Sequence, residues 1–137
     1  MITAKTKGKM IEKATTIQKK AYAPYSGFKV GASLLGKNGE IYTGCNIENI
    51  SSGLTVCAER HAVFSAVSDG CQEFSVLVVI SDSSPPVTPC GACRQVLAEF
   101  TKELRIILVN PEGEQSEFSL SRLLPEPFSG GSGNHEF

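Results

Sequence analysis

The sequence has no excess of charge of either sign, since 13 Lys and Arg residues stand against 14 Asp and Glu residues and the net charge at pH 7 is -1. Proteins that bind nucleic acid or an acidic membrane carry a basic patch, and this balance does not provide one. The chain also lacks an apolar run long enough to span a bilayer, and its start, MITAKTKGKM, is not followed by the apolar core of a signal peptide. We therefore expect a cytoplasmic protein that binds a free small molecule, with no nucleic acid and no membrane as partner.

No internal repeat is visible in the sequence. The number of cysteines does not favour a disulfide framework either. There are five cysteines, an odd number, and a reducing compartment would keep them as thiols, which favours metal ligation or catalysis. At 137 residues, 41% of them hydrophobic, the chain can bury about two-thirds of its unfolded surface without disulfides. We expect a single domain over residues 1–137, with a flexible tail from about residue 129.

Hydrophobic periodicity in the first half predicts a helix followed by a hairpin. Apolar residues recur at helical spacing over residues 9–23, with lysines between them, and a proline follows. The segment FKVGASLLGKNGEIYTGCNIEN, residues 28–49, predicts two strands joined at Asn38-Gly39, a dipeptide that tolerates the positive φ angles of a tight turn.

The second half alternates helical and strand patterns. Residues 57–70 and 90–103 have helical spacing, whereas residues 75–82 and 104–110 are short apolar runs typical of buried strands. A turn at NPEGE and a short helix around SLSRLL complete the chain. This order favours an α/β fold in which a mixed β-sheet is covered by helices on both faces.

Each of the two later helices is expected to begin at a cysteine, Cys57 in CAER and Cys90 in PCGAC. Helix amino ends favour a thiolate over a thiol, so these cysteines are prepared to bind metal. Together with Cys93 they could hold one Zn²⁺ per subunit and leave the fourth tetrahedral position open to water. The alternative is a closed structural site whose fourth ligand is one of the remaining candidates, Cys45, Cys71 or His61. A CxxC redox protein would need a thioredoxin-like element order, which is absent.

Two residues beside Cys57 favour the catalytic interpretation. Glu59 lies in the first turn of the same helix, where its carboxylate can act as a general base without ligating the metal. Zn²⁺ with three thiolates sums to a charge of -1, which weakens the metal as a Lewis acid. Arg60 is close enough in sequence to bond the ligand sulfurs and partly neutralise them, although an exposed, uninvolved arginine is the alternative.

These residues resemble the Cys₃ form of the zinc deaminase signature, with CAE at residues 57–59 and PCGAC at residues 89–93. Three further motifs make the resemblance more specific than zinc deaminases in general: YAPYSGFKVGA, GCNIEN and LLPEPF. Together the motifs, which run from about Ala21 to Phe128, resemble the short, homotetrameric, zinc-dependent cytidine deaminases of pyrimidine salvage.

The resemblance implies a three-layer cytidine deaminase-like fold and the hydrolytic deamination of cytidine and 2′-deoxycytidine, with Glu59 as proton shuttle. It implies a homotetramer with shared active sites, in which Phe128 reaches the neighbouring subunit's pocket. The remaining substrate-binding residues would be Phe28 near the pyrimidine ring, Asn46 and Glu48 on the ribose 3′-hydroxyl, and Ala58. Independently, the two-residue spacing of Asn46 and Glu48 at the end of a strand predicts that both side chains point to one face.

The chain also departs from the family pattern. Ser52 stands where a tyrosine is common, and His61 where a threonine follows the CAER arginine. We interpret His61 as a half-buried helix residue rather than a fourth ligand. Two other functions remain open from the sequence: a deaminase of another aminopyrimidine, such as another nucleoside or an exposed nucleic-acid base, and a non-catalytic structural zinc module.

Overall fold

The computed structural model describes residues 2–130, and the part of the expected flexible tail from residue 131 onward lies outside the described residues. The centre of the fold is a mixed five-stranded sheet in the order β2-β1-β3-β4-β5. β3 and β4 are parallel, and the other neighbouring pairs are antiparallel. The strands are β1 (Val30–Gly36), β2 (Ile41–Cys45), β3 (Phe74–Ser81), β4 (Arg105–Val109) and β5 (Gln115–Ser119).

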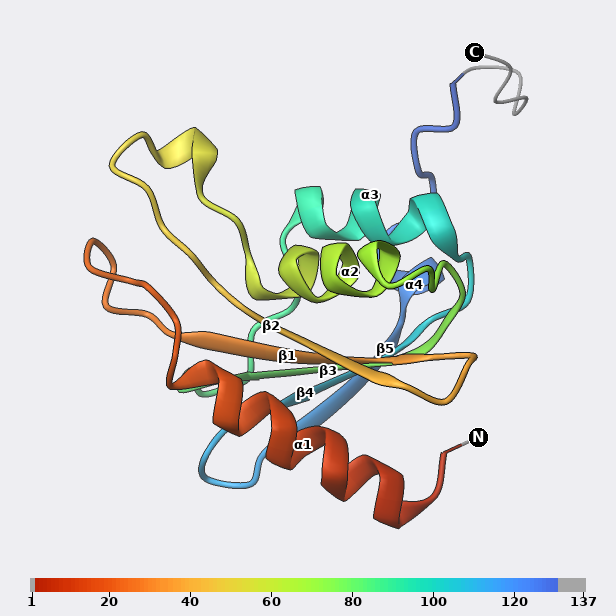
Figure 1. Ribbon diagram of the computed structural model, residues 1–137, viewed down its shortest axis with the longest axis horizontal. Coiled ribbons are helices and arrows are strands. Elements are labelled where there is room, and N and C mark those ends of the chain that lie inside the picture. Colours follow the sequence, from red (N-terminus) through yellow and green to blue (C-terminus); the bar gives the residue numbers. More distant parts are fainter. Residues whose placement is uncertain (1, 131–137) are drawn as a thin grey trace.

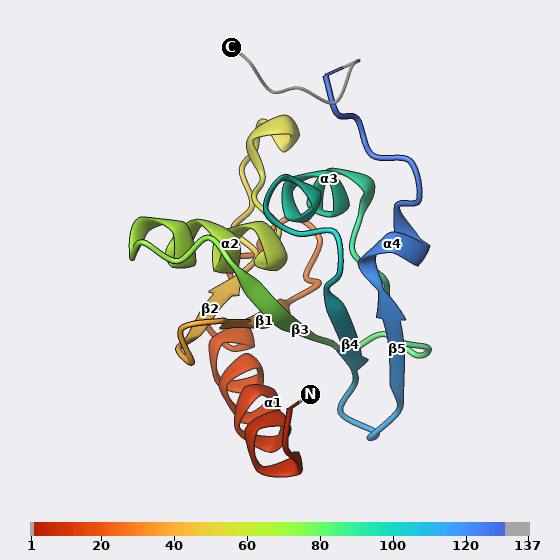
Figure 2. The ribbon, with the colours of Figure 1, turned by 90° about the vertical axis from the view of Figure 1, so that its right-hand side faces the viewer.

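Helices cover both faces of this sheet, which confirms the predicted fold class (Figures 1 and 2). α1 (Ala4–Gln18) packs on one face, while α2 (Ala58–Ser68), α3 (Gly91–Phe100) and the short α4 (Leu120–Leu123) lie on the other. A single 3₁₀ turn, η1 (Ser52–Leu54), interrupts the loop between β2 and α2. Within residues 2–130 no helix combines the length and the apolar character needed to cross a lipid bilayer.

The sheet divides the hydrophobic core into two clusters because successive strand residues point to opposite faces. On β3, Val76, Val78 and Ile80 pack toward α1, in a cluster with Met10. The alternate residues of the same strand belong to the second cluster, under α2 and α3. Both faces of the central strand are therefore buried, which explains the continuous apolar run in the sequence.

Two glycines allow the helices to approach the sheet closely. A Cβ at Gly31 would lie 2.1 Å from the carbonyl oxygen of Ala14 in α1, and one at Gly44 would lie 2.6 Å from the carbonyl oxygen of Ala58 in α2. Real Cβ atoms do not come this close to backbone atoms, so no side chain fits at either position without a shift of the helix. The glycines thus set the height at which α1 and α2 lie over the sheet.

The structure corrects three details of the prediction. α1 begins earlier than residue 9, because Thr3 caps it by accepting a hydrogen bond from the Thr6 backbone N–H at 3.1 Å, and it ends at Gln18. At the hairpin only Gly39 has a positive φ, 87°, so a three-residue loop closed by a bulge replaces the expected two-residue turn. Finally, β5 was not predicted, because this polar edge strand has no apolar run.

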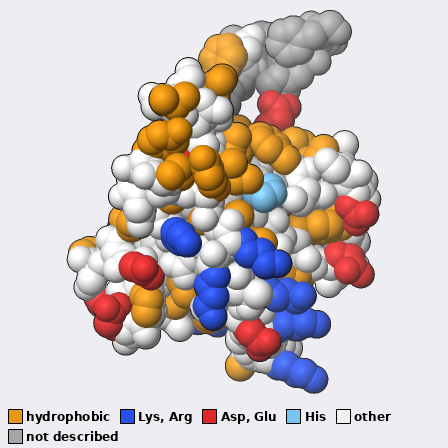
Figure 3. All heavy atoms as spheres, turned by 60° about the vertical axis from the view of Figure 1, so that its left-hand side comes forward, with side chains coloured by type: hydrophobic (Ala, Val, Ile, Leu, Met, Phe, Trp, Pro, Cys, Tyr) orange, Lys and Arg blue, Asp and Glu red, His pale blue; other side chains and the backbone are white. Residues whose placement is uncertain are grey.

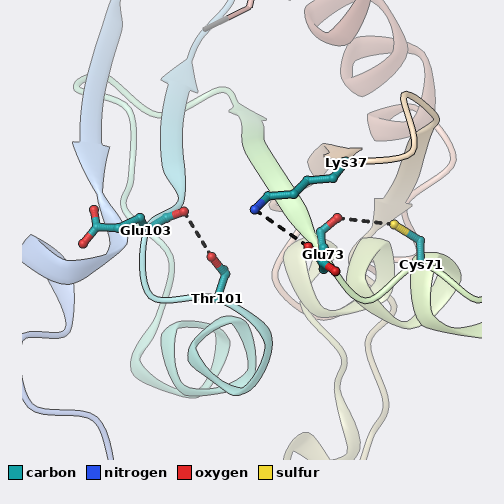
Figure 4. Close-up of polar contacts among 5 residues, drawn as sticks. All are labelled: Lys37, Cys71, Glu73, Thr101 and Glu103. Atoms are coloured by element: carbon teal, nitrogen blue, oxygen red, sulfur yellow. Dashed lines mark hydrogen bonds and ion pairs between the residues drawn. The ribbon is translucent and has the colours of Figure 1, made fainter.

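Polar contacts join the β1–β2 hairpin to the segment before β3, beyond the C-terminal end of α2 (Figure 4). Lys37 pairs with Glu73 at 3.8 Å, and the Cys71 Sγ donates to the Glu73 carbonyl oxygen at 3.4 Å. In the same view, the Thr101 hydroxyl donates to the Glu103 carbonyl oxygen just after α3. This region is separated from the amino ends of α2 and α3 by the length of those helices.

Candidate active site

Three cysteine sulfurs meet where α2 and α3 begin. Cys57 and Cys90 occupy the N-cap positions of the two helices, and Cys93 lies in the first turn of α3. The Sγ atoms of Cys57 and Cys90 are 3.9 Å apart, those of Cys90 and Cys93 are 3.5 Å apart, and all three lie within 4.8 Å of one another. Among residues 2–130 this is the one group of three or more potential ligand side chains close enough to share an ion.

The donor set fits zinc. Three sulfurs bound tetrahedrally at about 2.3 Å would lie roughly 3.8 Å from one another, and the observed spacings are close to that value. The sulfurs also sit at helix amino ends, where the unpaired N–H groups favour their anionic form. Cys93 is fully buried and Cys90 is exposed, so the cluster is open to solvent on one side.

The three residues considered as a fourth protein ligand lie elsewhere. Cys71 is beyond the far end of α2, where its thiol contacts Glu73. The His61 Nδ1 lies 3.1 Å from the backbone nitrogen of Cys45 and 3.0 Å from its carbonyl oxygen, so its ring binds the end of β2. The buried Cys45 does not join the cluster either. Within residues 2–130 the cluster therefore offers three candidate ligand sulfurs, and no fourth potential protein ligand lies close enough to join them.

Arg60 ties the cysteine cluster to the preceding loop. Its Nη2 lies 3.3 Å from the Cys57 Sγ and 3.3 Å from the Thr55 carbonyl oxygen. Its Nε–H is buried, and no hydrogen-bond partner for it lies within residues 2–130. The neighbouring Cys93 side chain and then the Arg60 guanidinium lower the pKa of Cys57 to about 5, whereas contact with Cys57 and burial raise the pKa of Cys93. At neutral pH the cluster thus holds negative charge beside a permanent cation.

Glu59 lies in the first turn of α2 and is 6% exposed. Burial, reinforced by the negative charge of Cys57, raises the pKa of its carboxyl group to about 7. The negative charge of the carboxylate also contributes to the raised pKa of Cys93. A buried carboxyl with a pKa near neutrality can both accept and donate a proton under physiological conditions.

Asn46 is the first residue after β2, and its buried side chain holds the chain segment that enters β1. Its Oδ1 accepts a hydrogen bond from the Val30 backbone N–H, and its Nδ2 donates to the Phe28 carbonyl oxygen, both at 2.8 Å. These contacts use one donor and one acceptor of the amide, which leaves a second N–H for another partner. Phe28, 38% exposed, is thereby fixed at its backbone.

Glu48 makes a similar contact with the loop before Phe28. Its Oε1 accepts from the backbone N–H groups of Tyr25 and Ser26 at 3.0 and 3.1 Å, and its Oε2 accepts from the Ser26 hydroxyl. These bonds, the hydroxyl first, hold the pKa of the carboxyl below its usual value. Asn46 and Glu48 therefore point toward the same segment, residues 25–30, as the two-residue spacing predicted.

The two other expected substrate contacts, Ala58 and Phe128, differ in their exposure to solvent. Ala58 has no exposed surface and packs in the core beneath α2, so the isolated chain does not present it to a ligand. Phe128 is 79% exposed, and its backbone is held by the side chain of Gln95 on α3. Ser52, the departure from the family pattern, lies in η1 and is exposed.

Arg94 was not singled out from the sequence, although it holds the approach to Cys90. Its Nε donates to the Pro89 carbonyl oxygen at 2.7 Å, its Nη2 to the Thr88 hydroxyl at 3.0 Å, and its Nη1 to the Leu123 carbonyl oxygen at 2.8 Å. All three partners lie in irregular segments or at a helix end, where no periodic pattern signals a contact. The position of Arg94, directly after Cys93, was the one available signal.

The family model and the similar curated proteins all point to cytidine deaminases. The family model for the cytidine and deoxycytidylate deaminase zinc-binding region matches residues 4–109. The chain is 49% identical over 122 residues to the cytidine deaminase of Sporosarcina psychrophila, covering 88% of this chain and 90% of that protein. It is 46% identical over 121 residues to the cytidine deaminase of Halalkalibacterium halodurans, covering 88% and 92%.

A solved structure agrees in fold and sequence. The crystal structure of cytidine deaminase from Burkholderia pseudomallei superposes with a TM-score of 0.86 at 44% identity, covering 93% of this chain and all of that one. The zinc-binding deaminase domain and the three-cysteine cluster together make zinc the cofactor, one ion per subunit. The chain therefore belongs to the zinc-dependent cytidine and deoxycytidylate deaminase family, and within it to the short cytidine deaminases.

Proposed function

We propose that the protein hydrolytically deaminates cytidine and 2′-deoxycytidine to the corresponding uracil nucleosides and ammonia. The observation that carries this proposal is the buried Glu59 carboxyl beside three convergent cysteine sulfurs at two helix amino ends. A purely structural zinc site would need a fourth protein ligand and would have no use for a carboxyl of raised pKa. The relatives named above, which are cytidine deaminases, support the choice of substrate.

Cys57, Cys90 and Cys93 would be the zinc ligands. The bound metal would supply Lewis acidity, which makes water a nucleophile near neutral pH. Arg60, 3.3 Å from the Cys57 sulfur, would offset part of the negative charge that three thiolates bring to the site. This arrangement keeps the ligand sulfurs anionic while limiting how far they weaken the metal.

Glu59 would move the protons of the reaction. Its carboxylate accepts a proton from the attacking water as the oxygen bonds to C4 of the pyrimidine, and it delivers that proton to N3. It then carries the remaining hydroxyl proton to the amino group at C4, which leaves as ammonia while the C4 carbonyl forms. A pKa of about 7 suits both the acid and the base role of a single carboxyl.

Phe28, Asn46 and Glu48 would position the nucleoside, with the ring of Phe28 beside the base and the two polar side chains at the ribose 3′-hydroxyl. Support comes from their convergence on one segment and from the donor that Asn46 keeps free. The negative charge of Glu48 would repel a 3′-phosphate. We therefore propose free nucleosides, rather than DNA or RNA, as substrates.

The active form would be a homotetramer in which Phe128 completes the pocket of a neighbouring subunit. Large hydrophobic side chains are exposed on two loops near the candidate site, among them Tyr25, Ile50 and Leu54 at 58%, 84% and 67%. Figure 3 shows hydrophobic side chains gathered on the upper part of this face, above a cluster of Lys and Arg. Apolar surface of this kind is typical of an oligomer interface.

In the cell, the reaction would serve pyrimidine salvage in the cytoplasm. The described residues include five free cysteines, three of them grouped around the candidate metal site, and a reducing compartment keeps such thiols available for zinc. Deamination of cytidine returns its base and sugar to the pool of uracil nucleosides.

The test is an ultraviolet assay of zinc-loaded protein with cytidine, 2′-deoxycytidine and a single-stranded oligodeoxycytidylate, with Glu59→Gln protein in parallel. We expect the two nucleosides to be converted, the oligonucleotide to be left unchanged, and Glu59→Gln to keep one zinc per chain while losing nearly all turnover. Near-native turnover in Glu59→Gln would reject the proton-shuttle role. Bound zinc without turnover of any substrate would favour the structural-zinc alternative. Sedimentation of an active monomer would reject the shared active site.

A further inference from the structure

The backbone of Phe128 is held by one side-chain amide. Gln95 Nε2 donates to the Phe128 carbonyl oxygen at 3.1 Å, and the Phe128 N–H donates to Gln95 Oε1 at 3.2 Å. The amide thus pairs with both polar groups of a single residue, as a neighbouring strand would. This fixes the backbone of Phe128, while the residue itself is 79% exposed.

Beyond α4, the C-terminal segment does not pack tightly on α3. A hollow of about 560 Å³ lies between the helix and residues 120–129, and its lining includes Ala98 and Glu99 on the helix side and Leu124, Pro125 and Pro127 on the other. Pro125, Glu126 and Pro127 are exposed. Leu120, at the start of this segment, is buried in the core, but close apolar packing does not fix residues 125–128. The paired hydrogen bonds at Gln95 therefore set where Phe128 lies.

Gln95 also links this segment to the cysteine cluster. It lies two residues after Cys93 in α3, and the adjacent Arg94 bonds the Leu123 carbonyl oxygen, so the helix holds the segment at two points. The same helix carries Cys90 at its N-cap. The distance from the metal-binding turn to Phe128 is thus set by one rigid element.

We propose that Gln95 is a positioning residue that fixes the Phe128 backbone, so that the phenyl ring is presented to the active site of a neighbouring subunit. The inference rests on the cross-subunit role given to Phe128 in the proposed function. It adds a specific requirement: position 95 needs one donor and one acceptor on a planar group, which an amide has. A carboxylate keeps only the acceptor, and a thioether has neither of comparable strength.

A fluorescence measurement tests the clamp without reference to activity. The sequence contains no tryptophan, so Phe128→Trp introduces a single reporter. We would measure its steady-state anisotropy in zinc-loaded protein, alone and combined with Gln95→Met, Gln95→Glu or Glu99→Met. Glu99 lines the same hollow one helical turn further on and serves as the matched control. We expect the anisotropy to fall with Gln95→Met, to fall less with Gln95→Glu, and to stay unchanged with Glu99→Met; equal values in all four proteins would overturn the proposal.

A kinetic double-mutant cycle then connects the clamp to the reaction. We expect Gln95→Met to raise KM for cytidine by up to about tenfold, the loss set by two hydrogen bonds, with kcat changed much less. In the Phe128→Ala background the same change should add nothing, because the ring that Gln95 positions is gone. Fully additive effects would mean that Gln95 acts elsewhere and would overturn the proposal, and thermal unfolding of each variant separates these effects from misfolding.

Different results would reject the cross-subunit role of Phe128 and the positioning role of Gln95. If Phe128→Ala leaves KM unchanged, the cross-subunit role in the proposed function is wrong and the inference, which presents the ring to that site, falls with it. If Phe128→Ala raises KM but Gln95→Met changes neither KM nor the anisotropy, only the positioning role of Gln95 is overturned.

Discussion

Gly44 of β2 lies directly beneath Ala58 of α2, so close that a Cβ on the glycine would stand 2.6 Å from the alanine carbonyl oxygen. Gly44→Ala must therefore lift the start of α2, the turn that carries Cys57 and Glu59. We expect a loss of roughly 1–3 kcal/mol in the free energy of unfolding, typical of overpacking, together with weaker zinc retention. Urea denaturation and metal analysis would measure both. Gly53→Ala, where nothing lies within 4 Å of the new Cβ, is the control, and an equal loss there would contradict the steric explanation.

Gly8→Ala should have the opposite effect. Gly8 lies inside α1, is exposed, and has no heavy atom within 4 Å of an added Cβ. Because alanine loses less conformational freedom in a helix than glycine, we expect the free energy of unfolding to rise by about 0.5–1 kcal/mol. Catalytic constants should be unchanged, since α1 lies on the face of the sheet away from the cysteine cluster. A destabilised variant would show that Gly8 has a role that this structure does not explain.

Arg94→Met should loosen the approach to Cys90. The substitution keeps the apolar stem but removes the bonds to Thr88, Pro89 and Leu123. We expect zinc to be lost to a competing chelator several-fold faster than from the unaltered protein, with faster amide hydrogen exchange over residues 87–90. Arg122→Met, on the exposed side of α4, removes a cation from the Phe118 ring and should change neither rate. Unchanged zinc loss in Arg94→Met would show that the ligand loop is held by its other contacts.

The contact between Glu48 and the loop at residues 25–26 should depend on pH. Hydrogen bonds from the Ser26 hydroxyl and then from the backbone lower the pKa of Glu48 below 4.5. A depressed carboxyl pKa means that the contact is fully present above the ordinary value and is lost as the pH falls through the folded-state value. In NMR spectra, the amide resonances of Tyr25 and Ser26 should shift together, with a midpoint below 4.5. Glu48→Gln should abolish this shared titration; its persistence would assign the titration to another group.

Much of the fold followed from patterns that are local in sequence. The apolar run of β3, the helical spacing of α2 and α3 and the Gly39 turn each have a signal within about ten residues, and the cysteines at the two helix starts indicated where the candidate site lies. β5 was not predicted because it is a short polar edge strand whose partly buried residues, Ser116, Phe118 and Ser119, include a single large apolar side chain. The early start of α1 was not predicted, because its first turn is polar and is defined by the Thr3 cap.

Contacts between irregular segments could not be predicted in the same way. Nothing in the sequence pairs Gln95 with Phe128, which are 33 positions apart, or Asn46 with the backbone of Phe28 and Val30. Such bonds join side chains to main-chain groups in loops, so they depend on how the whole sheet and its helices are assembled. The residue types and the family resemblance indicated that these positions matter, but not which atoms meet.

The division of the core by the sheet has a consequence for engineering and for sequence drift. Met10, Ala14 and their partners form a cluster that shares no residue with the one beneath α2 and α3, where the cysteines and Glu59 are mounted. Stabilising substitutions can thus accumulate on the α1 side of the sheet without altering the residues of the candidate active site on the other side. The residues that pack α1 against the sheet can therefore be replaced independently of those that pack under α2 and α3.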